Sequence, residues 1–99
     1  MKENKFAEYL KKALDAKEKR CWEEAVKYLK KAIKHDEKNY LPYLLLGLIY
    51  KQQKKWQAAI TTLEKATSLK PDQGEAYKIL GVIYKKLDKL TKATDNFKK

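Results

Sequence analysis

The sequence predicts an all-α protein made of three copies of one helix-turn-helix unit. Apolar side chains recur at helical spacing along the chain, and only three Gly and two Pro interrupt its 99 residues. The pattern also repeats after 34 residues, so that Gly47 meets Gly81 and Trp22 meets Trp56 when the chain is compared with itself. A fixed period of this length is typical of helical solenoids, in which each unit packs on the next.

The first copy covers about residues 6–39 and is predicted to form helices over 5–18 and 22–35. Ala13 stands where the other copies have Gly47 and Gly81, which raises helix propensity but keeps the two helices further apart. The second helix has the clearer apolar face, because its apolar residues follow one another at steps of three and four. These residues are Trp22, Ala25, Leu29 and Ala32.

The second copy covers about residues 40–73 and is predicted to form helices over 40–53 and 56–69, with a polar corner between them. Asn39 can cap the first of these helices, and Pro42 falls in its first turn, where a missing N–H costs little. Gly47 and Ala59 are small enough to let the two helices of this hairpin approach closely.

The third copy covers about residues 74–99, and we expect helices over 74–87 and 90–98. Asp72 and Glu75 have the spacing of a capping box at the start of the first. This copy is shorter than the others, and no polar capping helix follows it. We therefore expect partly exposed apolar side chains there, and either a place within a larger protein or self-association as a homodimer. The residues concerned are Ile83, Leu87, Leu90 and Phe97.

One set of residues recurs at matched positions of the copies. In the second copy the set is Tyr43, Leu46, Gly47, Tyr50, Ala59, Leu63, Ala66 and Pro71. In the third it is Tyr77, Leu80, Gly81, Tyr84, Ala93 and Phe97, and the first keeps only Tyr9, Ala25, Leu29 and Ala32. This set resembles the signature of the tetratricopeptide repeat (TPR) family. The resemblance implies a right-handed superhelical stack of three hairpins with a concave groove that holds a peptide or helix of a partner protein.

The resemblance also implies which positions line the groove, and here they form an apolar strip flanked by lysines. We expect a protein-protein interaction scaffold that binds the apolar face of a helix or peptide, with acidic residues near the lysines. Purely structural roles for these residues stay open, because a cation at a helix C-terminus is stabilised without any ligand and the leucines can pack between helices. The expected groove residues are Leu10, Leu14, Lys17, Leu41, Leu44, Leu45, Leu48, Lys51, Lys78, Val82 and Lys85.

Some members of this family bind the acidic C-terminal tails of heat-shock chaperones through a clamp of Lys, Asn, Asn, Lys and Arg. None of the matching positions in this chain carries the required residue, and the acidic one would repel a carboxylate. We therefore do not expect a partner of the chaperone-tail type. The residues at the clamp positions are Leu10, Leu14, Leu45, Glu75 and Ile79.

The formal net charge of +11 is spread over all three copies and favours acidic proteins, nucleic acid or anionic lipid as partners. The simplest interpretation is that lysines solvate the outer helix faces. RNA binding is a weaker alternative, because Trp56 and Tyr84 are expected to be buried and Arg20 is the only arginine. The lysines that favour RNA lie at the predicted corners: Lys54, Lys55, Lys85, Lys86 and Lys89.

The first two copies are also similar to the opening repeats of tetratricopeptide scaffold subunits of superkiller complexes, which support an RNA helicase that feeds the exosome. The runs that carry this similarity are Lys12-Ala13 with Asp15-Ala16, Lys38-Asn39-Tyr40 and Pro71-Asp72-Gln73. This similarity implies an alternative role as a basic accessory module of an RNA-decay assembly.

Catalytic and metal-binding patterns are not expected in this chain. His35 is the only histidine and lies near a predicted helix end, where it can serve as a cation. Cys21 is the only cysteine, so neither a disulfide within the chain nor a cysteine metal site can form. No cofactor motif is present, the longest apolar stretch, 44–50, is too short to span a bilayer, and the N-terminus does not resemble a signal peptide. We expect an intracellular protein, in the cytoplasm or the nucleus.

Overall fold

A computed structural model describes the chain over residues 4–97, with side chains described for residues 4–90. This part of the chain forms five α-helices and no strand. The helices are α1 (Lys5–Glu18), α2 (Trp22–His35), α3 (Tyr40–Gln52), α4 (Trp56–Leu69) and α5 (Gly74–Phe97). The all-α prediction is confirmed, and the bounds predicted for the first four helices agree with the structure to within one residue.

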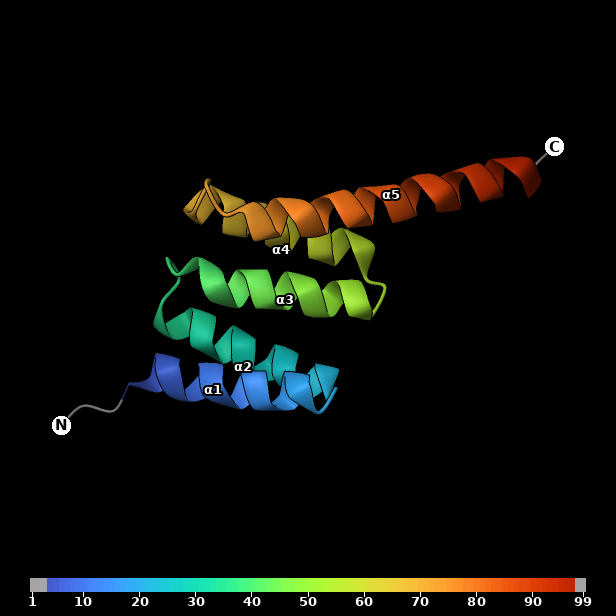
Figure 1. Ribbon diagram of the computed structural model, residues 1–99. Coiled ribbons are helices and arrows are strands. Elements are labelled where there is room, and N and C mark those ends of the chain that lie inside the picture. The colour runs from blue at the N-terminus through green and yellow to red at the C-terminus, as the bar shows by residue number, and fades with distance from the viewer. Residues whose placement is uncertain (1–3, 98–99) are drawn as a thin grey trace.

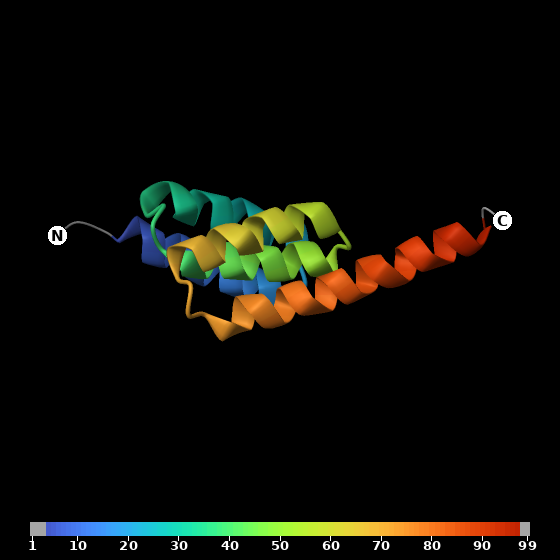
Figure 2. The same cartoon turned by 90° about the horizontal axis from the view of Figure 1, so that it is seen from above.

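Successive helices run antiparallel and form two layers (Figures 1 and 2). Helices α1, α3 and the N-terminal half of α5 lie in one layer, and α2 and α4 lie in the other. The molecule is elongated, with principal extents of 65 × 29 × 18 Å. The C-terminal half of α5 extends beyond the ends of the other helices (Figure 2).

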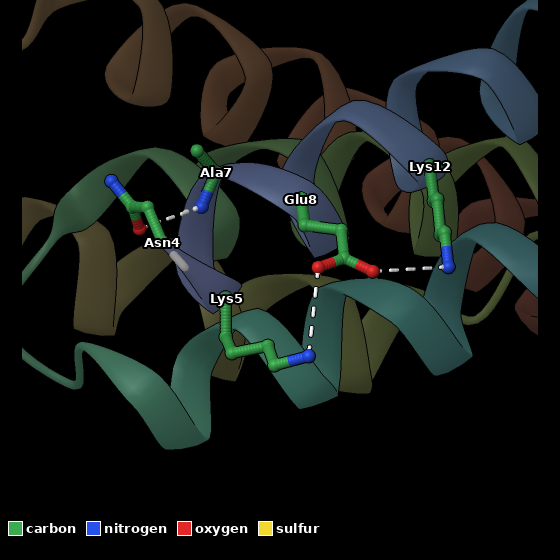
Figure 3. Close-up of polar contacts among 5 residues, drawn as sticks. All are labelled: Asn4, Lys5, Ala7, Glu8 and Lys12. Atoms are coloured by element: carbon green, nitrogen blue, oxygen red, sulfur yellow. Dashed lines mark hydrogen bonds and ion pairs between the residues drawn. The ribbon is translucent and has the colours of Figure 1, made fainter. Parts of the chain in front are cut away.

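Polar side chains cap the starts of α1, α3 and α5, whereas α2 and α4 begin without a side-chain cap. At α1 the Ala7 N–H donates to Asn4 Oδ1 over 3.1 Å, and the Glu8 carboxylate lies 3.7 Å from Lys5 and 3.4 Å from Lys12 (Figure 3). These ion pairs are exposed, so each contributes little to stability. The α1 cap therefore fixes where the first hairpin starts, while the neighbouring charges mainly keep its outer face in water.

The two later caps test the predictions made for α3 and α5. At α3 the Leu41 N–H donates to Asn39 Oδ1 over 3.0 Å, as expected for an Asn cap. At α5 the Glu75 N–H donates to Gln73 Oε1 over 3.3 Å, so Gln73 serves this helix start. The expected capping box on Asp72 is therefore wrong, because α5 begins one residue later than that box requires.

Both hairpin corners turn through one residue in the left-handed region. Arg20 has φ 60° and Lys54 has φ 62°, and they lie at matched positions of the first two repeats. The N–H after each left-handed residue returns to the helix: Cys21 donates to the Ala16 carbonyl over 2.8 Å, and Lys55 to the Tyr50 carbonyl over 2.9 Å. These bonds satisfy carbonyls that the end of a helix would otherwise leave unpaired.

The core consists of two clusters of buried apolar side chains, one on each side of α3. The first is shared by α1, α2 and α3, and Tyr50 packs against both clusters. The first cluster contains Ala13, Ala16, Ala25, Leu29, Leu46 and Ile49. The second contains Leu44, Ala59, Ile60, Leu63, Ala66, Ala76, Ile79, Leu80 and Ile83.

The third repeat is not a hairpin. The chain was expected to turn between residues 87 and 90, but α5 continues through this position as one helix. A non-glycine residue in the left-handed region costs about 1–2 kcal/mol, which the returning helix offsets when it buries large side chains. In the third repeat Leu90 replaces the Trp22 and Trp56 of the others, so a returning helix would bury a smaller side chain, and the lysines and leucines on either side of Asp88 favour a continuous helix.

Because α5 continues straight, Gly81 has no side chain packed against it, unlike Gly47 of the second repeat. A Cβ added to Gly47 would lie 2.5 Å from Leu63 Cγ, which shows how closely α3 and α4 approach. A Cβ added to Gly81 would meet nothing within 4 Å. The close approach expected for Gly47 is confirmed, although its partner is Leu63. The same approach expected for Gly81 and Ala93 is absent at Gly81, and the side chain of Ala93 lies outside the described residues.

Candidate functional site

The predicted groove residues lie on α1, α3 and α5 but differ in exposure. Leu14, Lys78, Val82 and Lys85 are exposed, whereas Leu10, Lys17, Leu41, Leu45, Leu48 and Lys51 are half-buried. Leu44 is only 9% exposed and belongs to the second core cluster. The expectation that it lies on the groove surface is therefore wrong. Its side chain packs with α4 and α5 and offers a partner little surface.

The half-buried leucines of the strip also contribute to packing. Leu10 and Leu45 pack against the first core cluster, and Leu41 and Leu48 pack against the second. Such side chains hold the helices together and can still present one edge to a partner. Leu14 on α1 and Val82 on α5 are the apolar members of the strip with the most exposed surface.

Two of the predicted residues, Lys51 and Val82, meet in a hollow between the α3–α4 corner and α5. This hollow has a volume of about 200 Å³. A second hollow of about 330 Å³ shares three of its residues and continues along α5. We refer to the two together as the basic cleft. It is lined by Lys51, Gln52, Lys54, Trp56, Val82, Lys86, Lys89 and Leu90.

The basic cleft combines four lysines with an apolar floor. Trp56 is half-buried and lines both hollows, while Val82 and Leu90 are exposed on α5. None of its lining residues, among the described side chains, is acidic. Lysines that converge on a cleft raise the local concentration of anionic ligands, because their fields add over a short distance. The cleft can therefore hold a ligand that presents both a carboxylate or phosphate and an apolar group.

Sequence reasoning missed the exposure of two aromatic residues, of which Trp56 lines the cleft and Tyr84 lies outside it. Trp56 and Tyr84 were expected to be buried in hairpins, but Trp56 is only half-buried and Tyr84 is 50% exposed. Tyr84 is exposed because no returning helix covers α5. Trp56 directly follows Lys54-Lys55 at the corner, and this basic-aromatic run was the signal that could have found it.

The apolar residues expected to be exposed in the third repeat also differ in their exposure. Ile83 is fully buried at 0% exposure, so its expected exposure is wrong: its side chain lies on the face of α5 that packs on α4. Leu87 is half-buried and packs against the second cluster, and Leu90 is exposed. The side chain of Phe97 lies outside the described residues.

The other candidates for chemistry lie apart from the cleft. The His35 ring stacks on Tyr9 with 5.6 Å between centroids. Cys21 is exposed at the α1–α2 corner, in a hollow of about 440 Å³ that also contains Glu23, Glu24 and Gln53. Within residues 4–90 no three His, Cys, Asp or Glu side chains lie close enough together to hold a metal ion. The helices of the described chain are also too short or too polar to cross a membrane.

Tyr43 lies in the first turn of α3, and the pKa of its phenol is above the ordinary value. Burial raises the pKa of the Tyr43 phenol, and the negative charge of Glu37 raises it further. The Tyr43 hydroxyl donates to the Glu37 carbonyl over 3.4 Å. The phenol thus stays neutral and anchors the start of α3 to the preceding loop.

Comparison with known proteins agrees with the repeated helices. The sequence model of the tetratricopeptide repeat matches residues 22–93. The chain belongs to the tetratricopeptide repeat family. Repeats of this family are protein-interaction modules without catalytic activity of their own. No curated protein matches the chain.

The solved structures that share the fold of this chain include two TPR domains. The TPR domain of Arabidopsis OM64 superposes with a TM-score of 0.81 at 22% identity, covering 94% of this chain and 77% of that one. The second TPR domain of Spaghetti (RPAP3), bound to the HSP90 peptide SRMEEVD, gives 0.82 at 19% identity, covering 96% and 88%. At these identities the likeness establishes the fold alone.

Proposed function

We propose that the chain is a protein-protein interaction scaffold that binds an acidic peptide or helix of a partner across α1, α3 and α5. The observation that carries this proposal is the basic cleft, where lysines from α3, the corner and α5 surround an apolar floor. An apolar side chain of the ligand would pack on Trp56, Val82 and Leu90. Acidic residues beside it would reach the lysines, which approach from more than one side.

From the cleft the ligand would continue along the exposed part of the apolar strip. Lys78 and Lys85 lie exposed on α5, and Leu14 lies exposed on α1 with the half-buried Lys17 one turn further on. These residues offer further cationic and apolar contacts but lie outside the cleft. Because the largest apolar side chain and four lysines lie together in the cleft, we expect the cleft to provide most of the binding energy.

We further propose that the ligand is not a chaperone tail bound through the usual clamp. The neighbour RPAP3 binds an HSP90 peptide, yet the matching positions of this chain lack the cations that such a clamp needs. Ile79 is buried in the core, and Glu75 is exposed where it would face a ligand carboxylate. Leu10, Leu14 and Leu45 provide no hydrogen-bond donors from their side chains.

Charge reversal in the cleft tests the proposed function. The probes are short fluorescent peptides with one Phe flanked by Glu residues, and matched peptides with Gln in place of each Glu. We expect the Glu peptides to bind more tightly, and Lys54→Glu with Lys86→Glu to weaken them about tenfold or more, which is about 1.4 kcal/mol. Fluorescence anisotropy measures both effects.

The matched control reverses two lysines outside the cleft, Lys30→Glu and Lys65→Glu, which changes the net charge equally. Both lysines are exposed on α2 and α4. If the control pair weakened binding as much as the cleft pair, the peptide would be attracted by the net positive charge of the whole molecule and not by the cleft. Equal binding of Glu and Gln peptides would end the proposal.

RNA is a second candidate ligand, favoured by the exposure of Tyr84 and the half-exposed Trp56 beside the lysines. Bases could stack on these rings while lysines meet phosphates. A basic accessory module of an RNA-decay assembly of the superkiller type would be the setting of this role. Titration with single-stranded oligouridine at low and high salt tests it, because phosphate contacts weaken steeply with salt. No binding at low salt would exclude it.

A further inference from the structure

Within residues 4–97 no helix packs on one face of α5, although α4 covers the matching face of α3 in the second repeat. Tyr77, Gly81 and Tyr84 follow one another at steps of four and three, so they share one side of the helix. Both tyrosines are 50% exposed, and a Cβ on Gly81 would meet nothing within 4 Å. We call these three residues the open face of α5.

The second repeat shows what fits such a face. Its matching residues are Tyr43, Gly47 and Tyr50, and α4 lies against them so closely that Leu63 fills the space beside Gly47. Ala59, one turn before Leu63, is fully buried. The shape that fits is therefore an antiparallel helix that carries a small residue and, four positions later, a bulky aliphatic one.

The chain does not supply this helix itself in the structure, because residues 88–97 continue straight along α5 and lead away from the open face (Figure 2). The charge near the open face indicates which kind of helix it favours as a partner. Lys78 and Lys85 lie exposed on α5 next to it, Asp88 is the acidic residue one turn after Tyr84, and the whole chain carries a net charge of +11. Two copies would repel each other, whereas a helix with acidic residues would be attracted.

We propose that an amphipathic, acidic helix of a partner protein docks antiparallel on the open face and completes the third repeat. A bulky aliphatic side chain of this helix enters the notch at Gly81, its small residue lies between the tyrosines, and its acidic residues reach Lys78 and Lys85. Val82 and Lys86 lie on a different side of α5, since each residue turns the helix by about 100°. The basic cleft thus remains open when this helix is bound.

The probe for this interaction is a fluorescent peptide with the sequence of residues 56–69, the helix that fits Gly47. A side-chain link between its positions 57 and 61, both exposed in α4, keeps it helical. The acidic form carries Glu at positions 64, 65 and 68, and the basic form carries Lys at the same three positions. We expect the acidic form to bind at least about tenfold more tightly than the basic form.

Substitution of Gly81 in the protein tests the notch. Gly81→Leu fills the notch and should weaken the acidic peptide about tenfold or more. Gln57→Leu is the matched control, since Gln57 is an exposed, uncharged residue of α4 and does not belong to the open face. Circular dichroism should show that both variants keep the helix content of the parent chain.

Three results would overturn the proposal. Equal binding of the acidic peptide by Gly81→Leu and the parent chain would exclude the notch. A dimer in sedimentation equilibrium that Gly81→Leu abolishes would assign the face to a second copy. Absence of peptide binding, together with a lower melting temperature of Gly81→Leu, would mean that the chain covers the face with its own C-terminal residues.

Discussion

At the scale of single residues, two glycines at matched positions have different surroundings. Gly47→Ala should destabilise the chain by about 1–3 kcal/mol, because the new Cβ would overlap Leu63 and the hairpin would have to open. Gly81→Ala should stabilise it by about 0.5–1 kcal/mol, because the new methyl meets no atom and alanine favours the helix. Urea unfolding followed by circular dichroism measures both. A shift of the two variants in the same direction would contradict this difference in packing.

Tyr43 makes stability depend on pH in the alkaline range. Its pKa in the folded chain is raised above the ordinary value of 10.0, so the folded state holds this proton more tightly than the unfolded state. The associated stability is complete below pH 10 and is lost as the pH rises through the folded pKa. In Tyr43→Phe the loss of stability above pH 10 should be smaller than in the parent chain, as measured by thermal melts across this range.

The informative quantity is the difference between Tyr43→Phe and the parent chain, because the two proteins share all their other ionisable groups. Tyr9→Phe serves as the control, since it removes a phenol whose hydroxyl does not bond to the loop before α3. An identical alkaline response of Tyr43→Phe and the parent chain would show that Tyr43 contributes nothing.

Single residues also show where sequence patterns stop being informative. Helical spacing identified the apolar faces, but the family resemblance placed Leu44 on the groove although it lies in the core, and the missing capping helix led us to expect Ile83 on the surface although it is buried. Their burial depends on how neighbouring helices are rotated, and this rotation is not encoded in the spacing of one helix.

At the scale of elements, the two corners rely on non-glycine residues in the left-handed region. Arg20→Gly should stabilise the first hairpin by about 1 kcal/mol, because glycine adopts φ 60° without a clash of its Cβ. Lys19→Gly is the matched control, since Lys19 has φ −83° and gains nothing from glycine. Thermal or urea unfolding compares the two, and a gain for both or for neither would contradict the strain at Arg20.

The helices could be predicted wherever a packing partner follows in the chain. In the first two repeats, tryptophan, alanine and leucine recur on the second helix, and the hairpins form as expected. In the third repeat the same period continues in weaker form, and α5 does not turn. A repeat in the sequence indicates where a turn can form. Whether the turn forms depends on the backbone strain at the corner residue and on how much apolar surface the following helix buries.

At the scale of the whole molecule, the chain is extended and highly charged. Its Cα radius of gyration is 15.4 Å, compared with about 13 Å for a compact domain of 100 residues. Each repeat contacts mainly its neighbours, so the stability of a solenoid is roughly the sum of its repeats and their interfaces. The site was less predictable than the fold for the same reason: the basic cleft joins α3, the corner and α5, and its shape depends on the straight course of α5.

The net charge of +11 should oppose the folded state, because folding brings the lysines closer together. Salt shortens the range of this repulsion from about 30 Å at 0.01 M to about 8 Å at 0.15 M. We therefore expect the melting temperature to rise by a few degrees over this range, where about 4–8 °C corresponds to 1 kcal/mol in a domain of this size. A fall in melting temperature with sodium chloride would mean that attractive pairs outweigh the repulsion.

The exposed Cys21 has a practical consequence for binding measurements on this chain. It is the only thiol of the chain, and it lies at the α1–α2 corner, in the first repeat, whereas α5 lies at the other end of the stack (Figure 1). A dye, a spin label or a sensor surface can therefore be attached at one defined atom. The chain would then be held at its first repeat, with the open face of α5 at the other end of the stack accessible to solution (Figure 1).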